Sequence, residues 1–106
     1  MPLQPRIIPV LLLHKGGLYK TKQFKKPIYV GDPINAVRIL NEKQVDELMI
    51  LDIDCSGNNS EPNYDLLEEI ASEAFMPVAY GGGVKNLEIA KKLFKLGIEK
   101  VVLNSV

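Results

Sequence analysis

The sequence lacks several features that would place it in whole classes of protein. Thirteen basic and thirteen acidic residues leave no net charge, which argues against nucleic acid as the main partner. Cys55 is the single cysteine, so a disulfide framework is excluded and a reducing compartment is favoured. No apolar run approaches the length of a membrane span, and residues 1–5 lack the basic and apolar regions of a signal peptide. These absences predict a cytoplasmic protein that binds neither nucleic acid nor a membrane.

Strand-like and helix-like segments alternate along the 106 residues. Buried strands are predicted at 6–13, 47–53, 77–80 and 100–103, where apolar residues run together. Helices are predicted from Pro33 to about Lys43, after a cap at Asn63, and from Leu87 to Leu96 between Asn86 and Gly97. Residues 14–31 read as a long, lysine-rich segment broken by glycines. The alternation predicts an α/β fold with a parallel sheet and right-handed crossovers.

The chain is too short for a closed parallel barrel, which needs roughly 250 residues. Four strands and three helices cannot cover both faces of strands that are apolar on both sides. We therefore expect residues 1–106 to be a single (β/α)4-like half of a (β/α)8 barrel, and a stop directly after a strand is typical of a truncated part. A face carrying Ile8, Val10, Leu12, Met49, Leu51 and Val102 would meet water in a monomer, so we expect the fragment to form a homo-oligomer.

The stretch from Pro77 to Lys85 places three consecutive glycines, 81–83, between a strand and a helix. Backbone N–H groups can approach a ligand closely where no Cβ intervenes, and a helix N-terminus favours an anion such as phosphate. The alternative is a sterically tight turn that binds nothing. A second feature is charge at three strand entrances, where Arg6, Glu47 and Lys100 share the inward parity. Simple solvated strand ends are the alternative there.

The segments RIIPVLLL, KGGLYKT, GDPINA, VDELMILDID, PVAYGGGVK and KLGIEKVVLNS occur in this order across nearly the whole chain. Together they resemble the N-terminal half of the HisF family, the cyclase subunits of imidazole glycerol phosphate synthase. The resemblance implies a (β/α)8 barrel that receives ammonia from a HisH-like glutaminase partner. It also implies a small substrate with a phosphate at each end, and neither a metal nor a cofactor.

Several residue roles follow from the resemblance alone. It implies that Lys20 belongs to a loop that closes over substrate, and that Arg6, Glu47 and Lys100 form a salt-bridge cluster that gates ammonia entry. Glu99 matches an acidic position that faces the glutaminase. The phosphate site implied for the N-terminal half consists of Gly82, Gly83, Asn104 and Ser105.

One departure from the family concerns catalysis. The family's first catalytic aspartate aligns with Leu12, which cannot transfer protons, and the second lies beyond Val106. Asp52 matches a family aspartate near the site but does not replace the missing group by position. The strand with Leu12 instead resembles a HisF-like branch linked to bacterial surface polysaccharides, in which the barrel supplies ammonia for acetamidino-sugar formation. We expect the fragment alone to be inactive.

Two other readings stay open beside this one. Many barrels share a glycine turn of this kind, so a phosphate-binding half-barrel with different chemistry is possible. The other is a non-catalytic fragment that folds only by pairing with another copy. His14 and Cys55 are read as structural, because neither has an identifiable partner in a known nucleophile or acid–base motif.

Overall fold

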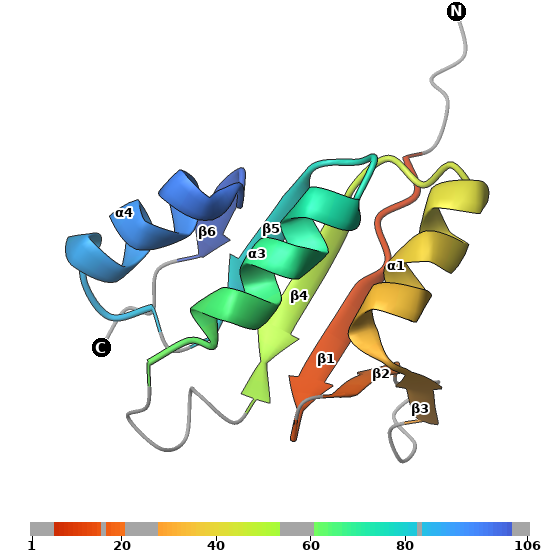
Figure 1. Ribbon diagram of the computed structural model, residues 1–106, viewed down its shortest axis with the longest axis horizontal. Coiled ribbons are helices and arrows are strands. Elements are labelled where there is room, and N and C mark those ends of the chain that lie inside the picture. The colour runs from red at the N-terminus through yellow and green to blue at the C-terminus, as the bar shows by residue number, and fades with distance from the viewer. Residues whose placement is uncertain (1–5, 16, 21–27, 54–60, 83, 103–106) are drawn as a thin grey trace, which may run out of the picture.

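The structure is a computed structural model that describes residues 6–15, 17–20, 28–53, 61–82 and 84–102. These residues form a six-stranded sheet in the order β3-β2-β1-β4-β5-β6 (Figure 1). The parallel part consists of β1 (Val10–His14), β4 (Leu48–Asp52), β5 (Val78–Gly81) and β6 (Lys100–Val102). The predicted α/β fold with a parallel sheet is therefore confirmed.

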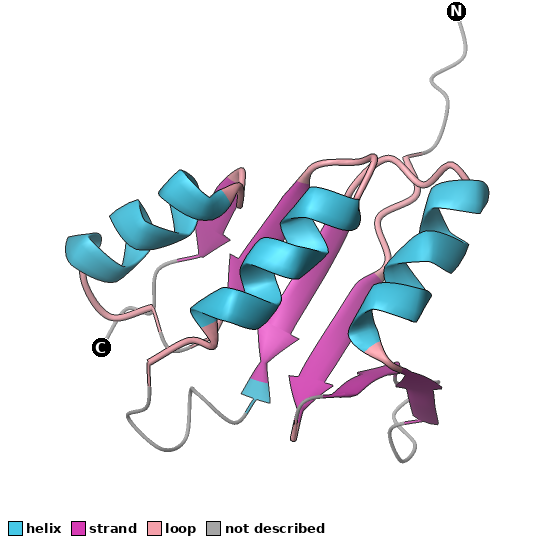
Figure 2. Ribbon diagram, in the orientation of Figure 1, coloured by secondary structure: helices cyan, strands magenta, loops and turns pink. Residues whose placement is uncertain are grey.

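All three labelled helices lie on the same face of the sheet (Figures 1 and 2). They are α1 (Pro33–Glu42), α3 (Tyr64–Glu73) and α4 (Leu87–Leu96), and α3 packs between the other two. Each begins as the sequence predicts, because the side chains of Asp32, Asn63 and Asn86 accept hydrogen bonds from backbone N–H groups in the first turn. No helix in the described ranges is long and apolar enough to cross a membrane.

The hydrophobic core lies between the sheet and these helices. Strand alternation sends Leu11 and Leu13 of β1 and Leu48 and Ile50 of β4 to this side, where all four are buried. Helices α1, α3 and α4 cover them with Val37, Leu67, Ile70, Ile89, Ala90 and Leu93. A continuous core therefore forms on one face of the sheet only.

The opposite face of the sheet, which we call the open face, carries the inward-facing residues predicted from the sequence. Val10 and Val102 are 48% and 49% exposed, and Ile8 is 38% exposed. Leu12, Met49 and Leu51 are partly buried by their neighbours. No described helix covers this side (Figure 1). The chain thus presents apolar side chains to water where a closed barrel would have its interior.

The main difference from the sequence expectation lies in residues 14–31. Two strands, β2 (Gly17–Lys20) and β3 (Ile28–Gly31), form an antiparallel extension beside β1. His14 pairs with Gly17, and Lys15 takes a positive φ of 49°, as the first turn residue of a primed hairpin does. Strands of four residues each show too little alternation to be read from sequence.

Candidate functional site

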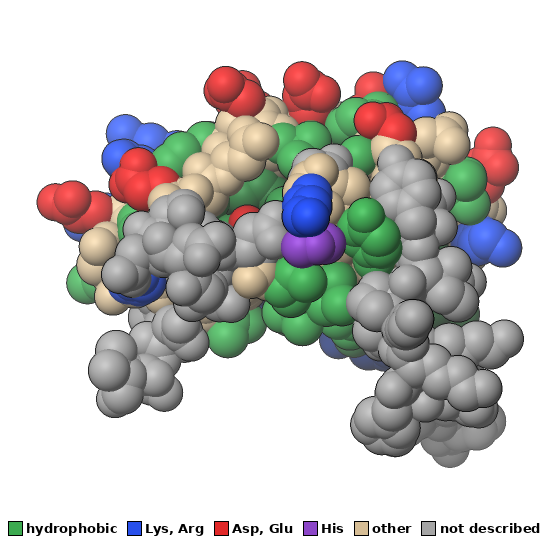
Figure 3. Space-filling model, turned by 90° about the horizontal axis from the view of Figure 1, so that it is seen from below, with side chains coloured by type: hydrophobic (Ala, Val, Ile, Leu, Met, Phe, Trp, Pro, Cys, Tyr) green, Lys and Arg blue, Asp and Glu red, His purple; other side chains and the backbone are tan. Residues whose placement is uncertain are grey.

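The carboxyl ends of β1, β4, β5 and β6 meet at one end of the sheet. The register aligns Leu13 with Asp52, Leu51 with Gly81, and Gly81 with Val102. Figure 3 looks at the molecule from this end and shows hydrophobic side chains around the single histidine. Because ligands of parallel α/β folds bind at this end of the strands, it is the first place to look for a substrate site.

The glycine turn after β5 has a strict steric requirement. Gly82 has φ +99°, and a Cβ added there would overlap the backbone carbonyl of Asp52 on the neighbouring strand. Gly81 is also confined, because its Cβ would lie 3.0 Å from the Leu51 side chain. The turn therefore needs glycine to pass this close to β4, whether or not a ligand binds. Gly83 lies outside the described residues.

A buried hydrogen bond joins the last residue of β4 to the penultimate residue of β5. The Tyr80 hydroxyl donates to Oδ2 of Asp52 at 2.8 Å, and both side chains are buried. By strand alternation Asp52 shares the helix-covered side with Leu48 and Ile50, not the open face. Sequence analysis named Asp52 as a candidate but missed Tyr80, which the apolar run 77–80 had marked only as strand.

Leu12 occupies the open face near the end of β1. Its strand neighbours are Leu51 on β4 and Tyr19 on β2. The rings of Tyr19 and His14 lie 5.8 Å apart between centroids with an interplanar angle of 60°. The surroundings of Leu12 are thus aliphatic and aromatic. His14, which the sequence offered as a lone residue, has an aromatic neighbour supplied by the unexpected hairpin.

The opposite end of the sheet holds an ion pair between two of the predicted gate residues. Lys100 Nζ lies 2.8 Å from Oε1 of Glu47, whose side chain is only 8% exposed, whereas that of Lys100 is 61% exposed. The pair spans β5, where Ala79 is the register partner of both Met49 and Lys100 and carries only a methyl group. The alternation of side chains along the strands predicted that Glu47 and Lys100 share a face, and in the structure these residues, 53 positions apart in the sequence, are in contact.

The other predicted site residues are placed less fully. Arg6 is exposed, and among the described residues the ion pair of Glu47 is made with Lys100 and not with Arg6. Glu99 is exposed at the same end of the sheet, and its N–H donates to the carbonyl of Val78 at 2.9 Å. Lys20 ends β2, but the structure does not describe its side chain. Asn104 and Ser105 lie outside the described residues.

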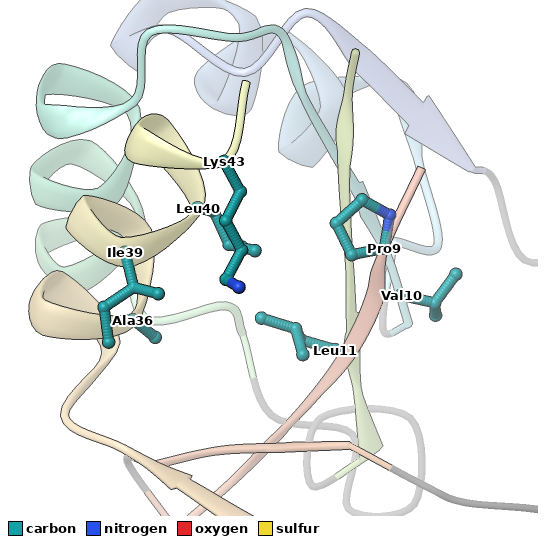
Figure 4. Close-up of a pocket in the computed structure, with 7 residues that line it drawn as sticks. All are labelled: Pro9, Val10, Leu11, Ala36, Ile39, Leu40 and Lys43. Carbon is teal, nitrogen blue, oxygen red and sulfur yellow. The ribbon is translucent and has the colours of Figure 1, made fainter. Parts of the chain in front are cut away.

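A cavity of about 340 Å³ opens between α1 and the first residues of β1, away from the carboxyl ends of the strands (Figure 4). Its lining is aliphatic apart from one lysine: Pro9, Val10, Leu11, Ala36, Ile39, Leu40 and Lys43. It lacks the convergent polar groups of a reaction site. Nor do the described residues contain a group of His, Cys, Asp or Glu side chains that could hold a metal ion.

Comparison with known proteins agrees with this arrangement. A family model described as "Histidine biosynthesis protein" matches residues 6–106. A relative from Pseudomonas aeruginosa, named "Putative imidazole glycerol phosphate synthase subunit hisF2", is 63% identical over 100 residues, which is 94% of this chain and 40% of that protein. The imidazole glycerol phosphate synthase subunit HisF of Streptococcus mutans is 37% identical over 103 residues, or 97% of this chain and 41% of that protein.

The chain therefore spans about two fifths of the length of these relatives. On the family match over residues 6–106, the chain belongs to the histidine biosynthesis protein family, among relatives named as HisF subunits of imidazole glycerol phosphate synthase.

Proposed function

We propose that this chain is the ammonia-receiving part of a HisF-type synthase subunit. In this proposal a HisH-type glutaminase docks at the amino ends of the strands and releases ammonia there. The ammonia crosses along the open face of the sheet, and a phosphorylated small molecule binds at the carboxyl ends. Family membership supports the general role. The groups that this role would use are the ion pair at the amino ends of the strands and the glycine turn at their carboxyl ends.

The single observation that carries the proposal is the Glu47–Lys100 ion pair. A carboxylate with 8% side-chain exposure has a large desolvation cost unless it is paired, and Lys100 pairs with it at 2.8 Å. The lysine is mostly exposed, so its ammonium group can leave without crossing the core. A charged pair at a strand entrance with one exposed member suits a gate that opens when a partner protein contacts the lysine.

The carboxyl ends support substrate binding less directly. Gly82 brings the turn against β4 at this end of the sheet. The phosphate site implied by the family, Gly82, Gly83, Asn104 and Ser105, would lie at the carboxyl ends of β5 and β6. We propose that phosphate binds there, with Lys20 contributing from the hairpin.

The identity of residue 12 bears on which of two biosynthetic reactions uses the ammonia. On β1 Leu12 faces the open side between Leu51 and Tyr19, so the position of the family's first catalytic aspartate is apolar. We propose that the subunit supplies ammonia for the formation of an acetamidino sugar and does not carry out the cyclisation of histidine biosynthesis. An apolar lining does not protonate ammonia, and a conduit needs no acid at this position.

The test couples glutamine hydrolysis to this chain. Purified HisH-type glutaminase from the same organism should hydrolyse glutamine faster when the chain is added. The Lys100→Met chain should stimulate hydrolysis to a different extent from wild type, relative to the rate of the glutaminase assayed without any chain. A phosphate titration followed by NMR should shift the Gly82 amide, and Asn104→Ala should weaken the binding. A rate of glutamine hydrolysis that stays the same at every concentration of added chain would overturn the proposed role.

A second candidate function rests on the exposed open face. A chain that leaves Val10 and Val102 about half exposed could serve as a non-catalytic phosphate-binding unit that assembles with another copy. It would bind phosphate without stimulating a glutaminase, so the same pair of measurements separates the two candidates.

A further inference from the structure

The most exposed large apolar side chain among the described residues is Phe75, at 87%. It lies in the short turn between α3 and β5, where the chain enters the sheet at the amino ends of the strands. A lone exposed apolar residue needs no explanation in itself. Phe75 differs because a hydrogen bond holds its backbone in place and two surface hollows lie beside its side chain.

The turn that carries Phe75 is fastened to α1 by the side chain of Asn41. The Asn41 Nδ2 group donates to the carbonyl of Glu73 at 2.9 Å, and its Oδ1 accepts from the N–H of Phe75 at 2.9 Å. The Glu73 carboxylate also pairs with Arg38, whose Nη2 lies 3.3 Å from Oε1. A side chain presented from a fixed backbone loses less conformational freedom when a partner buries it.

Two surface hollows flank the exposed ring. One, of about 360 Å³, is lined by Arg38, Asn41, Glu42, Glu73 and Phe75. The other, of about 380 Å³, is lined by Asn41, Glu42, Gln44, Val45, Phe75 and Met76. An aromatic side chain that projects between hollows with polar rims has the anatomy of a protein-binding hot spot, in which one anchor fills a pocket on the partner.

Phe75 and the Glu47–Lys100 pair lie at the same end of the sheet, where the strands begin. The N–H of Leu48, the residue after Glu47, donates to the carbonyl of Pro77 at 3.0 Å. Only Met76 separates Phe75 from Pro77 in the sequence. The surface around Phe75 is therefore continuous with the strand entrance that the proposed function assigns to ammonia.

We infer that Phe75 is an anchor residue for the glutaminase subunit and is inserted into an apolar pocket of that partner. The inference rests on the proposed function, because a partner that delivers ammonia at Glu47 must cover the adjoining surface to exclude water. A second copy of the chain is a poorer occupant. The exposed apolar residues that self-association would bury, such as Val10 and Val102, lie on the open face of the sheet and not on this turn.

The experiment measures the affinity of the purified chain for the HisH-type glutaminase by isothermal titration calorimetry. Phe75→Ala should raise the dissociation constant about 10- to 100-fold, as is usual for an aromatic hot spot. Phe94→Ala is the matched control, because Phe94 is also an exposed phenylalanine, at 51%, but lies on α4. It should leave the dissociation constant within about 2-fold of wild type. Because both rings are exposed, both variants should keep the wild-type circular dichroism spectrum.

Asn41→Ala tests the positioning of the ring with Phe75 itself retained. Loss of both Asn41 hydrogen bonds frees the turn, so binding should weaken by a smaller factor than in Phe75→Ala. Equal affinity of wild type and Phe75→Ala for the glutaminase would overturn the anchor role while leaving the proposed function intact. Absence of any wild-type binding would overturn the proposed function. Loss of self-association in Phe75→Ala, seen by light scattering without glutaminase, would assign the ring to a second copy and also overturn the inference.

Discussion

Two adjacent residues of β1 allow a direct test of whether the open face must be covered. Val10 and Leu11 point to opposite sides of the strand (Figure 4). Val10 is 48% exposed on the open face, whereas Leu11 is 5% exposed beneath the helices. We predict that Val10→Lys abolishes self-association of the 106-residue chain, whereas Leu11→Ala lowers its stability and leaves the mode of association unchanged.

The magnitudes follow from these exposures. Full burial of a valine side chain is worth ~1.5–3 kcal/mol, so covering the exposed half of Val10 contributes about 1 kcal/mol per copy. A lysine at this position would place an ammonium group in the covered face, at a cost of several kcal/mol. In an isolated chain the same substitution should change the free energy of unfolding by less than about 0.5 kcal/mol. Leu11→Ala should cost about 2–5 kcal/mol in either state.

Sedimentation velocity over a range of concentrations gives the state of association, and urea unfolding gives the stability. Wild type should sediment as a dimer or larger species, Val10→Lys as a monomer, and Leu11→Ala as the wild-type species with a lower unfolding midpoint. A wild-type chain that stays monomeric at every concentration, and unfolds cooperatively at the same urea concentration as Val10→Lys, would refute the reasoning. The open face would then need no cover.

Three further substitutions test individual contacts by urea unfolding. Tyr80→Phe should lower the free energy of unfolding by about 1–3 kcal/mol, because buried Asp52 loses a hydrogen-bond donor; an unchanged midpoint would show that the hydroxyl contributes nothing. Lys100→Met should cost about 1–3 kcal/mol, because it leaves the buried Glu47 carboxylate without its cation, and the cost should shrink at high salt if charge causes it. Gly97→Ala should cost about 1–2 kcal/mol, since Gly97 has φ +121° and its Cβ would lie 3.0 Å from that of Ala71; no loss would mean that the helix end readjusts.

Much of the fold could be predicted because local signals and burial agree. Asn86 and Gly97 bound α4 at the residues expected, since a capping side chain and a left-handed glycine act within one turn of the helix. The parallel strands were recognisable from apolar runs. The hairpin of β2 and β3 was not, because its pairing depends on contact with β1 and its four-residue strands carry little pattern of their own.

The site was predictable where strand parity decides the geometry. Alternation alone puts Glu47 and Lys100 on one face, and the structure pairs them. The Tyr80–Asp52 hydrogen bond needed the register between β4 and β5, which no single segment of sequence contains. The hydrogen bond that holds the Phe75 backbone likewise comes from Asn41, 34 residues earlier in the chain.

Strand alternation also explains how this part of the sheet could conduct ammonia without reacting with it. Asp52 ends β4 on the helix-covered side, where Tyr80 holds its carboxylate. Toward the same end of the open face, the strand residues of the described chain are Leu12, His14, Leu51, Gly81 and Val102, and none of them is a carboxylate. The buried carboxylate of the open face lies instead at the other end, paired with Lys100. A charged pair therefore lies at the entrance of the proposed path, while its continuation is aliphatic and aromatic apart from the imidazole of His14. This order fits the proposed passage of a small neutral molecule along the open face.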